Sequence, residues 1–357
     1  MEKRLCNAGW GFTNACNLNC KHCYNSSGEN KGKNEIFLED AKKIVNKLAK
    51  NKVKTINYGT GESGLAKDFW ELVKYTNQKG IIQGLTTNGW SVNEKSIRLI
   101  KKYMNDVDVS LDYGNEKDHN WFRGSKNAWK GAIKALNLLK ENCIEFSIVV
   151  CITAKNCSKK NIDKLLSLSK EYGCDLRINW FKPTGRGKYN QEFKLNIKQV
   201  NETFKYIIKK AYIRAMPDPY FSALLGINSR KGCPCGKDSF RITPNGIVVP
   251  CVYFTKEMDN INLVNSEFSE IINSKPFKEI NNRIIKFCKN CEYFENCRGG
   301  CASRAYLEFG SMNEPDAFCF KKAGLKKNPF KNMKFEYKPG SLKVHENYLC
   351  TIIVKAK

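Results

Sequence analysis

Between residues 5 and 215 the sequence alternates strand-like and helix-like stretches, and this alternation leaves few folds open. Strand-like stretches such as "VKTINYG" and "IEFSIVVCIT" are each followed by an amphipathic stretch with apolar residues at helical spacing. About six such units imply a parallel sheet with right-handed crossovers. Because six units are too few for an eight-stranded barrel, we predict an α/β fold with a partial (β/α)6 TIM-like barrel. Residues 197–215 are predicted to close it as one helix.

The pattern changes after about residue 216, which predicts further parts of the chain. We expect residues 1–215 to form the barrel domain, 216–231 a linker, 232–320 a small cysteine-rich domain and 321–357 a basic C-terminal tail. In the cysteine-rich part, "FRITPNGIVVPC" predicts a hairpin around Pro-Asn-Gly. The tail ends in the strand-like "YLCTIIVKAK".

Three cysteines stand close together after the first predicted strand, in the stretch "CNLNCKHC". Cys16, Cys20 and Cys23 follow a CxxxCxxC spacing, and the next cysteine is Cys143. A structural zinc site takes four ligands. Three thiols without a fourth suit an iron–sulfur cubane with one iron left open to a ligand that is not protein.

The chain has 17 cysteines, and a second set gathers late in the sequence. This set comprises Cys233, Cys235, Cys251, Cys288, Cys291, Cys297, Cys301 and Cys319. Six other cysteines are scattered, among them Cys151 and Cys350. We interpret Cys151, which lies in an apolar run, as a buried, inert thiol. The N-terminus lacks a signal-peptide core and no apolar run is long enough to span a membrane. We therefore predict a cytoplasmic protein in which cysteines bind metal or react, and no membrane partner.

The formal net charge is +26, which raises the question of a nucleic-acid partner. Lysine is abundant along the whole chain, however, and does not gather on one evident helix. Bound clusters would also add negative charge that the formal count omits. A nucleic-acid-binding protein with structural clusters is the less favoured alternative, and an acidic peptide or protein partner is preferred.

A CxxxCxxC loop after the first strand of such a series resembles the radical S-adenosylmethionine (SAM) superfamily. The resemblance implies that Cys16, Cys20 and Cys23 hold a [4Fe–4S] cluster and that SAM chelates its open iron. It also implies reductive cleavage of SAM to a 5′-deoxyadenosyl radical, which takes a hydrogen atom from the substrate. The cofactor then carries the difficult chemistry, while the protein orients it.

Other stretches resemble the segments that contact SAM in this superfamily. "YGTGES" is similar to its GGE motif, with Thr60 in place of the first glycine, and "TTNG" to a common third-strand ending. "VSLD" and "HNWFRG" resemble a fourth-strand serine and a later arginine, and the residue before the third cysteine often lies near adenine. The resemblance thus implies a SAM site made by His22, Thr60, Gly61, Glu62, Asn88, Ser110 and Arg123. Glu62 is expected to accept from the SAM ammonium, and Arg123 to face its carboxylate.

The late cysteines resemble the SPASM domain, which binds auxiliary [4Fe–4S] clusters. The resemblance assigns the first auxiliary cluster to Cys233, Cys235, Cys251 and Cys301, and the second to Cys288, Cys291, Cys297 and Cys319. Cys235 is the doubtful ligand, because the family pattern needs only one cysteine there. Without it, an open iron could bind substrate. Zinc is the alternative for the CxxC pairs.

The resemblance implies a three-cluster enzyme that modifies a ribosomally made peptide by crosslinking, epimerisation, excision or oxidation. The alternatives are an enzyme like the anaerobic sulfatase maturases, which generate formylglycine, and a cofactor-building enzyme acting on a small molecule. About fifteen residues precede the cluster loop, so a separate leader-recognition protein or the basic tail is expected to bind the leader. A flavodoxin or ferredoxin is the expected electron donor. No catalytic acid or base is singled out.

One position separates this chain from the sulfatase maturases. In them, an aspartate proposed as the base follows the cysteine of GxxxxC. Here Val252 follows Cys251, and the next carboxylates are Glu257 and Asp259. Because valine cannot accept a proton, we predict that formylglycine formation is not the activity.

Overall fold

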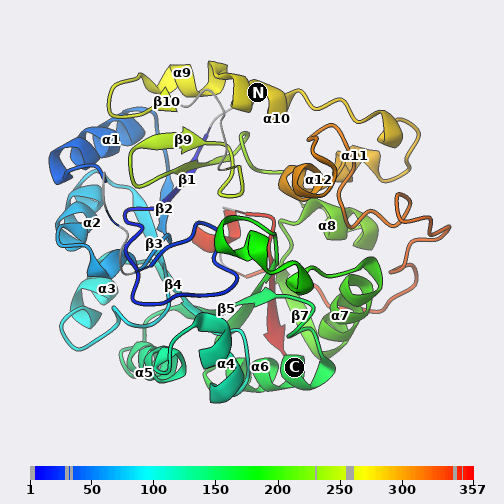
Figure 1. The fold of residues 1–357 in the computed structure, drawn as a ribbon, viewed down its shortest axis with the longest axis horizontal. Coiled ribbons are helices and arrows are strands. Elements are labelled where there is room, and N and C mark those ends of the chain that lie inside the picture. The colour runs from blue at the N-terminus through cyan, green and yellow to red at the C-terminus, as the bar shows by residue number, and fades with distance from the viewer. Residues whose placement is uncertain are drawn as a thin grey trace.

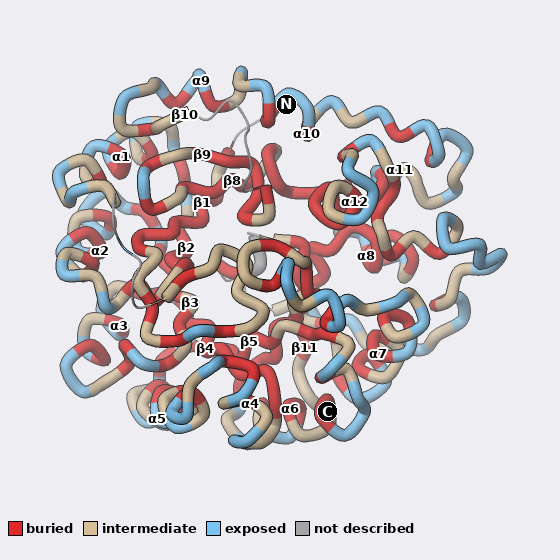
Figure 2. Tube along the Cα trace, viewed as in Figure 1, coloured by how far each residue is buried: buried red, intermediate tan, exposed pale blue. Residues whose placement is uncertain are grey.

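The computed structural model describes residues 5–28, 32, 35–229, 231–254, 261–340, 344–347 and 349–357. Its centre is an 11-stranded sheet with the strand order β10-β9-β8-β1-β2-β3-β4-β5-β6-β11-β7. Helices surround the strands, so that the sheet forms the wall of a partial barrel (Figure 1). Figure 2 shows the strands as the most buried part of the chain and the helices as the exposed rim.

The predicted strand–helix alternation is confirmed, and the strands and helices build a partial barrel of the α/β class. The parallel strands are β1 (Asn7–Trp10), β2 (Thr55–Tyr58), β3 (Ile82–Thr87), β4 (Asp106–Ser110), β5 (Phe146–Ile152) and β6 (Asp175–Trp180). The connecting helices are α1 (Leu38–Lys50), α2 (Phe69–Gln78), α3 (Ile97–Tyr103), α5 (Ala128–Glu141), α6 (Lys159–Glu171) and α7 (Ile197–Lys210). A shorter helix, α4 (Glu116–Arg123), precedes α5.

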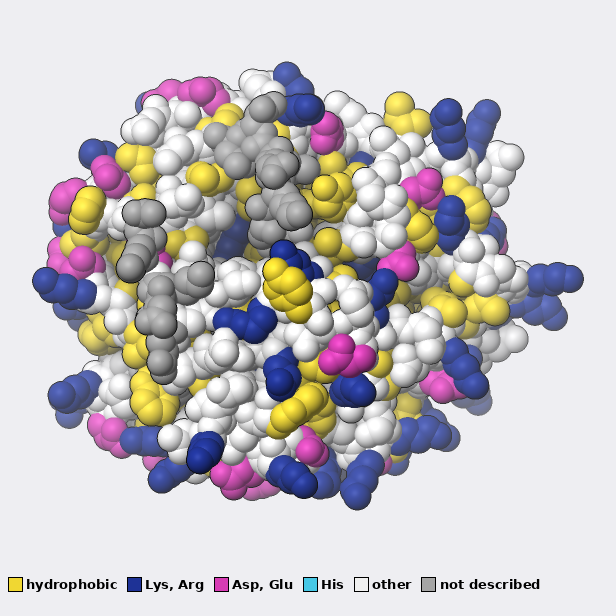
Figure 3. Space-filling model, viewed as in Figure 1, with side chains coloured by type: hydrophobic (Ala, Val, Ile, Leu, Met, Phe, Trp, Pro, Cys, Tyr) yellow, Lys and Arg dark blue, Asp and Glu magenta, His cyan; other side chains and the backbone are white. Residues whose placement is uncertain are grey.

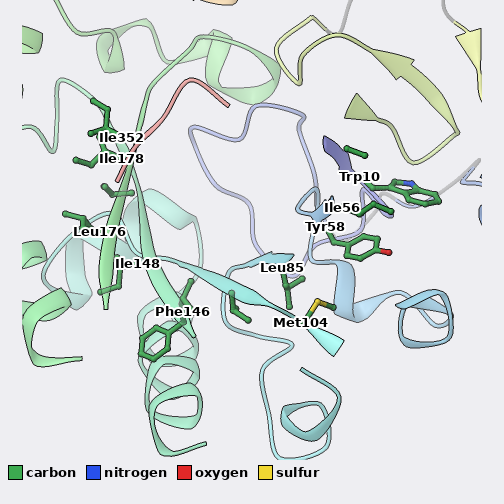
Figure 4. Close-up of a cluster of buried hydrophobic side chains, with 14 of the residues drawn as sticks. Trp10, Ile56, Tyr58, Leu85, Met104, Phe146, Ile148, Leu176, Ile178 and Ile352 are labelled. Atoms are coloured by element: carbon green, nitrogen blue, oxygen red, sulfur yellow. The ribbon is translucent and has the colours of Figure 1, made fainter. Parts of the chain in front are cut away.

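The core lies between the sheet and these helices. Helix α1 shows the arrangement: Ala41, Ile44, Val45 and Leu48 point inward and are fully buried. Figure 4 shows the strand side of the same core, where Trp10 and Tyr58 lie at one end of the drawn cluster and Ile178 at the other. Burying apolar side chains of this size stabilises a fold by about 1.5–3 kcal/mol each, so the barrel is the rigid frame that positions the loops.

The cysteine-rich part is joined to the barrel sheet. Strand β8 (Ser239–Ile242) pairs in parallel with β1, and β9 (Ile247–Val249) and β10 (Ile261–Asn262) continue antiparallel. The predicted Pro-Asn-Gly hairpin is confirmed as the β8–β9 connection, where Gly246 adopts a φ of +81°. The rest is helical, with α8 (Pro219–Leu225) before it and α9 (Phe268–Asn273), α10 (Lys275–Asn281), α11 (Phe294–Cys297) and α12 (Ala302–Phe309) within it.

The end of the chain returns to the barrel. The strand-like ending is confirmed as β11 (Ile352–Ala356), which lies antiparallel between β6 and β7 (Ala211–Ala215). The prediction that residues 197–215 form one helix is wrong at its end, because α7 stops at Lys210 and residues 211–215 pair with β11. A partner strand from the far end of the chain overrides the helical pattern. Within the described residues, no helix combines the length and hydrophobicity that crossing a bilayer requires.

Candidate functional site

The three cysteines of the first loop lie together after the end of β1. Cys16 and Cys20 are buried and Cys23 is half-buried. The three pack in one group with Leu18 and Ala128. The loop therefore brings its thiols to the carboxyl ends of the parallel strands, where enzymes built on such barrels place their chemistry.

Several N–H groups face the sulfur atoms of this loop. The backbone N–H of Leu18 lies 3.5 Å from Cys16 Sγ, and Asn88 Nδ2 lies 3.6 Å from the same sulfur. Arg123 Nη1 lies 4.0 Å from Cys20 Sγ. Sulfurs that carry an iron cluster accept such hydrogen bonds, which tune its potential. The surroundings of the loop therefore fit a bound cluster.

Burial also fits metal binding at these thiols. It raises the pKa of Cys16 to about 12 and that of Cys20 to about 11, because a charged sulfur loses its water. The guanidinium of Arg123 opposes this rise at Cys20. At neutral pH, both thiols would keep their protons unless a metal supplied the positive charge that displaces them.

The "GTGES" segment after β2 supports the loop through close backbone contact. Gly61 has a φ of +62°, and a Cβ there would lie 2.4 Å from the carbonyl oxygens of Thr13 and Ala15. The next backbone N–H, that of Glu62, donates to the Ala15 carbonyl at 2.9 Å. Only glycine combines this φ with this approach. Beside it, the Thr60 and Tyr24 hydroxyls lie 2.9 Å apart.

The Glu62 side chain is fully buried and already has donors within the protein. It accepts hydrogen bonds from the hydroxyls of Thr87 and Ser91 and, at 2.8 Å, from the backbone N–H of Asn88. Burial raises its pKa, while these hydrogen bonds lower it. Both carboxylate oxygens are therefore engaged within the protein, and Glu62 ties the end of β2 to the end of β3.

Asn88 and Arg123 also contact the cluster loop directly. Asn88 Nδ2 donates to Asn17 Oδ1 at 2.9 Å, and Arg123 Nε lies 2.6 Å from Asp112 Oδ2. Arg123 is thus held by a buried carboxylate while another of its nitrogens faces Cys20. This pairing fixes the guanidinium in position between the loop and the strand ends.

A cavity of about 150 Å³ lies beside the loop. Three of the residues predicted to contact SAM line it, namely His22, Ser110 and Arg123. All charged side chains in its lining are basic: Arg123, Arg177, Lys182 and Arg241. The Lys182 ammonium lies 4.1 Å from the ring centre of Tyr253. A second cavity of about 460 Å³ is lined by Thr60 and shares Tyr24, Arg241 and Val252 with the first.

His22 presents a neutral aromatic ring to the smaller cavity. The ring stacks on Phe122 with 4.1 Å between centroids and 4° between planes. Burial lowers the pKa of His22, and the charges of Arg123 and Arg186 lower it further. An uncharged ring at this wall suits stacking with a base such as adenine.

The cysteines that the resemblance assigns to the second auxiliary cluster lie together. Cys288, Cys291, Cys297 and Cys319 line one small cavity, together with aromatic side chains such as Tyr220. Burial raises the pKa of Cys288 to about 12, and the neighbouring thiols add to the rise. Four thiols that surround one void fit a fully ligated cluster.

The first auxiliary set holds five buried cysteines: Cys233, Cys235, Cys251, Cys301 and Cys350. The Cys233 thiol interacts with those of Cys301 and Cys350, and the Cys235 thiol with those of Cys233 and Cys251. The sequence placed Cys350 among the scattered cysteines. Among the residues that the structure describes, no three His, Cys, Asp or Glu side chains converge on a point where a single metal ion would sit.

Comparison with known proteins agrees with this geometry. Residues 10–164 match the radical SAM superfamily, and residues 233–301 match the SPASM iron–sulfur cluster-binding domain. The chain is a radical SAM enzyme with a SPASM domain. The predicted cofactors, SAM and several [4Fe–4S] clusters, are thereby confirmed.

Three similar proteins illustrate the range of this enzyme's relatives. Mycofactocin maturase MftC of Mycolicibacterium smegmatis is 29% identical over 326 residues, which cover 87% of this chain and 81% of MftC. AdoMet-dependent heme synthase of Methanosarcina barkeri is 25% identical, with 89% and 97% covered. The structure of native anSMEcpe with bound AdoMet and Cp18Cys peptide has a TM-score of 0.71 and 20% identity, with 91% and 95% covered, and shows the same fold.

Two residues of the enzyme's site escaped the sequence analysis. Cys151, expected to be an inert core thiol, is half-buried and lines the smaller cavity together with Val149, two residues earlier on β5. The alternation of a strand carries this signal, because residues two apart share a face. No comparable signal placed Cys350, since its neighbours come from distant parts of the chain.

Proposed function

We propose that this radical SAM enzyme modifies a ribosomally made peptide after taking a hydrogen atom from it. The carrying observation is the pair of adjoining cavities that the barrel and the SPASM domain line together. His22 reaches the smaller cavity from the cluster loop, and Tyr253 reaches it from the turn after Cys251. A substrate there would touch the SAM site on one side and the first auxiliary site on the other.

The proposal assigns SAM to the residues named from the sequence: His22, Thr60, Gly61, Glu62, Asn88, Ser110 and Arg123. When bound, SAM and the cluster supply a 5′-deoxyadenosyl radical. In this assignment His22 stacks with adenine, Ser110 and Arg123 line the chamber, and Gly61 lets the backbone approach. Glu62 and Asn88 keep the strand ends and the loop in register through their hydrogen bonds.

The proposal assigns the second auxiliary cluster to Cys288, Cys291, Cys297 and Cys319, because these thiols share one cavity. It draws the ligands of the first cluster from Cys233, Cys235, Cys251 and Cys301 and their neighbour Cys350. With full protein ligation, the auxiliary clusters would accept or pass electrons during the oxidation of the peptide and would not bind it.

Two observations favour a peptide as the substrate. MftC is named a maturase, and the anSMEcpe structure holds a peptide on the same fold. The two cavities also adjoin, and all charged side chains that line the smaller one are basic. Lys182 beside Tyr253 suits an anionic group on the substrate, such as a carboxylate.

The proposal also includes two protein partners, an electron donor and a leader-recognition protein. A flavodoxin or ferredoxin would deliver the electron, and a separate recognition protein would bind the leader of the peptide. We place the reaction in the cytoplasm, because cysteines that carry iron need a reducing compartment. Figure 3 shows Lys and Arg side chains scattered over the drawn face, both near its centre and along its rim. They do not gather in one patch, which does not favour a nucleic acid on that face.

Short peptides encoded next to the gene test the proposal. The reconstituted enzyme is incubated anaerobically with SAM, dithionite and each peptide, and both 5′-deoxyadenosine and peptide mass are measured. We expect one peptide to change mass in step with 5′-deoxyadenosine formation. Lys182→Met should raise the KM for that peptide, and Lys21→Met, which removes a lysine that lies over Trp121, should not.

A second candidate is a small-molecule reaction in cofactor synthesis. It rests on the 25% identity to AdoMet-dependent heme synthase, over 97% of that protein. Stimulation of SAM cleavage by an iron porphyrin carboxylate, with none of the peptides altered, would favour it over the maturase proposal.

A further inference from the structure

The segment near the C-terminus passes through the interior of the barrel. Residues Val344–Asn347 form a short 3₁₀ turn that contacts β2, β3 and β4. A Cβ at Gly84 on β3 would lie 3.0 Å from the Val344 side chain. In Figure 1 the red end of the chain runs behind the cluster loop before it enters the sheet as β11.

Buried polar contacts hold the start of this segment. His345 is 1% exposed, and its Nδ1 lies 3.0 Å from Asp106 Oδ2. Its Nε2 lies 3.0 Å from Thr86 Oγ1 and 3.3 Å from Asp108 Oδ2. Asp108 is also paired with Arg177 of β6. The histidine is therefore fixed to two neighbouring strands of the barrel, β3 and β4.

The other end of the segment is held by the sheet. The Thr351 hydroxyl donates to the carbonyl of Ile178 at 2.8 Å. Residues 352–354 pair with β6, and Ile352, Ile353 and Val354 are almost fully buried. The chain is thus fixed on both sides of Cys350, so the position of this cysteine is set by the fold and not by a loose tail.

Cys350 points into the first auxiliary set. Its residue is 4% exposed, its Sγ lies 3.8 Å from Cys233 Sγ, and its thiol also interacts with that of Cys301. Four separate segments now reach this set, namely the turn with Cys233 and Cys235, the end of β9, the start of α12 and the C-terminal segment. Each segment offers one thiol, and only the turn offers a second.

We propose that Cys350 is a protein ligand of the first auxiliary [4Fe–4S] cluster. A cubane has four iron corners that point in four directions, and four surrounding segments each bring at least one thiol to this set. Cys233, Cys251, Cys301 and Cys350 then bind the irons, and Cys235 is the spare thiol. This resolves the doubt about Cys235 by means of a residue outside the family spacing.

This ligation couples the metal site to the substrate chamber. Leu349, the residue before Cys350, lines the smaller cavity together with Ser110 and Arg123. The cluster would therefore fasten the wall of that cavity. A protein whose first auxiliary site is empty would hold residues 349–351 less firmly, although β11 would remain in the sheet.

The test compares three variants, Cys350→Ser, Cys235→Ser and Cys143→Ser, the last at an exposed position outside the cysteine sets. After anaerobic reconstitution, iron, sulfide and the EPR spectrum of the reduced protein are measured with and without SAM. We expect Cys350→Ser to lose about four irons or to shift one auxiliary signal. The SAM-responsive signal should remain, and Cys235→Ser and Cys143→Ser should match the unmodified protein.

A second measurement uses the unmodified chain, which avoids a variant that fails to fold. Hydrogen exchange of residues 349–351 is compared before and after a chelator removes iron, and we expect faster exchange after removal. Equal exchange in both states, or a Cys350→Ser protein with the iron content and EPR of the unmodified chain, would overturn the proposal. Neither readout uses a peptide substrate, so failure of the maturase proposal would leave both results interpretable.

Discussion

Arg304 and Asp218 form a buried ion pair in which Nη1 of the arginine lies 2.6 Å from Oδ2 of the aspartate. Asp218 caps α8, and Arg304 lies in the first turn of α12, three residues after Cys301. The same guanidinium pairs with Asp316, whose Oδ2 also accepts from the backbone N–H of Cys301 at 2.7 Å. One arginine therefore ties the segments around both auxiliary sites to the linker.

Replacing this arginine by methionine is expected to destabilise the enzyme. Arg304→Met would leave two carboxylates buried without their counter-charge, and losing one partner of such a pair costs about 3–5 kcal/mol. The midpoint of anaerobic urea denaturation should fall accordingly. Lys322→Met removes an exposed pair with Glu314 and should cost about 0–1 kcal/mol. Equal denaturation midpoints for the two variants would show that the buried ion pairs of Arg304 stabilise the fold no more than an exposed ion pair does.

The three-cluster assignment predicts the iron content. After reconstitution, we expect about twelve irons and twelve sulfides per chain. Alanine at Cys16, Cys20 and Cys23 together should leave about eight irons and abolish 5′-deoxyadenosine formation, because SAM then has no iron to chelate. Retained SAM cleavage in this triple variant, or about four irons with bound zinc in the unmodified chain, would contradict the assignment.

Gly61→Ala should disturb the cluster loop without touching a ligand. The new methyl group would lie 2.4 Å from two carbonyl oxygens of the loop, at a φ of +62°. Strain at such a position costs about 1–3 kcal/mol. We expect lower thermal stability and weaker SAM binding by calorimetry. Gly80→Ala is the matched control, because Gly80 has a φ of +73° with nothing within 4 Å. Similar SAM affinity in both variants would show that close approach is unimportant.

The C-terminal strand is expected to be essential for folding. Ile352, Ile353 and Val354 are buried between β6 and β7, and burying each such side chain contributes about 1.5–3 kcal/mol. Deleting residues 350–357 should therefore lower the unfolding midpoint strongly. Deleting the salt-bridged Lys357 alone, which pairs with Glu336 on the surface, should have little effect. Unchanged stability of the longer deletion would mean that β11 is dispensable.

The position of β11 in the sheet could not be predicted from the sequence. The strand-like ending was evident from "TIIVKAK", but its neighbours were not, because β6 and β7 lie more than a hundred residues away in the chain. The same gap explains why residues 211–215 were predicted as helix. The local sequence pattern shows only the periodicity of apolar residues. Whether a segment becomes a strand can depend instead on pairing with a distant part of the chain. The residues 321–357, predicted as a basic tail, thus end inside the barrel sheet.

The residues of the candidate site were predicted more completely than the pairing of β7 and β11. The resemblance to the SPASM domain grouped Cys288, Cys291, Cys297 and Cys319, and these four cysteines line one cavity. Glu62, expected to accept from the SAM ammonium, also accepts hydrogen bonds from the Thr87 hydroxyl and the backbone N–H of Asn88. A motif identifies which residues matter but does not show which of their atoms face the ligand. That choice depends on donors such as Thr87, which the motif does not include.

The last prediction concerns the position after Cys251, where a sulfatase maturase would carry a base. Val252 is 4% exposed and lines both cavities, so it occupies a position from which a carboxylate could reach a substrate. The smaller cavity has no Asp or Glu among the described residues that line it. Glu257 and Asp259, the alternatives offered by the sequence, lie outside the described residues. In the larger cavity, Glu35 already accepts from Thr13 and Asn14.

A sulfatase-derived peptide with the CxPxR motif should therefore not be converted to formylglycine, because none of the described residues that line the smaller cavity is a carboxylate that could take the proton that must leave with the hydrogen atom. The peptide is incubated anaerobically with enzyme, SAM and dithionite, beside a sulfatase maturase as positive control. Conversion would lower the peptide mass by ~18 Da for a Cys substrate and ~2 Da for the Ser form. We expect neither change, although SAM is cleaved. Either loss at turnover-level yield would show that another group serves as the base and that Val252 does not exclude this activity.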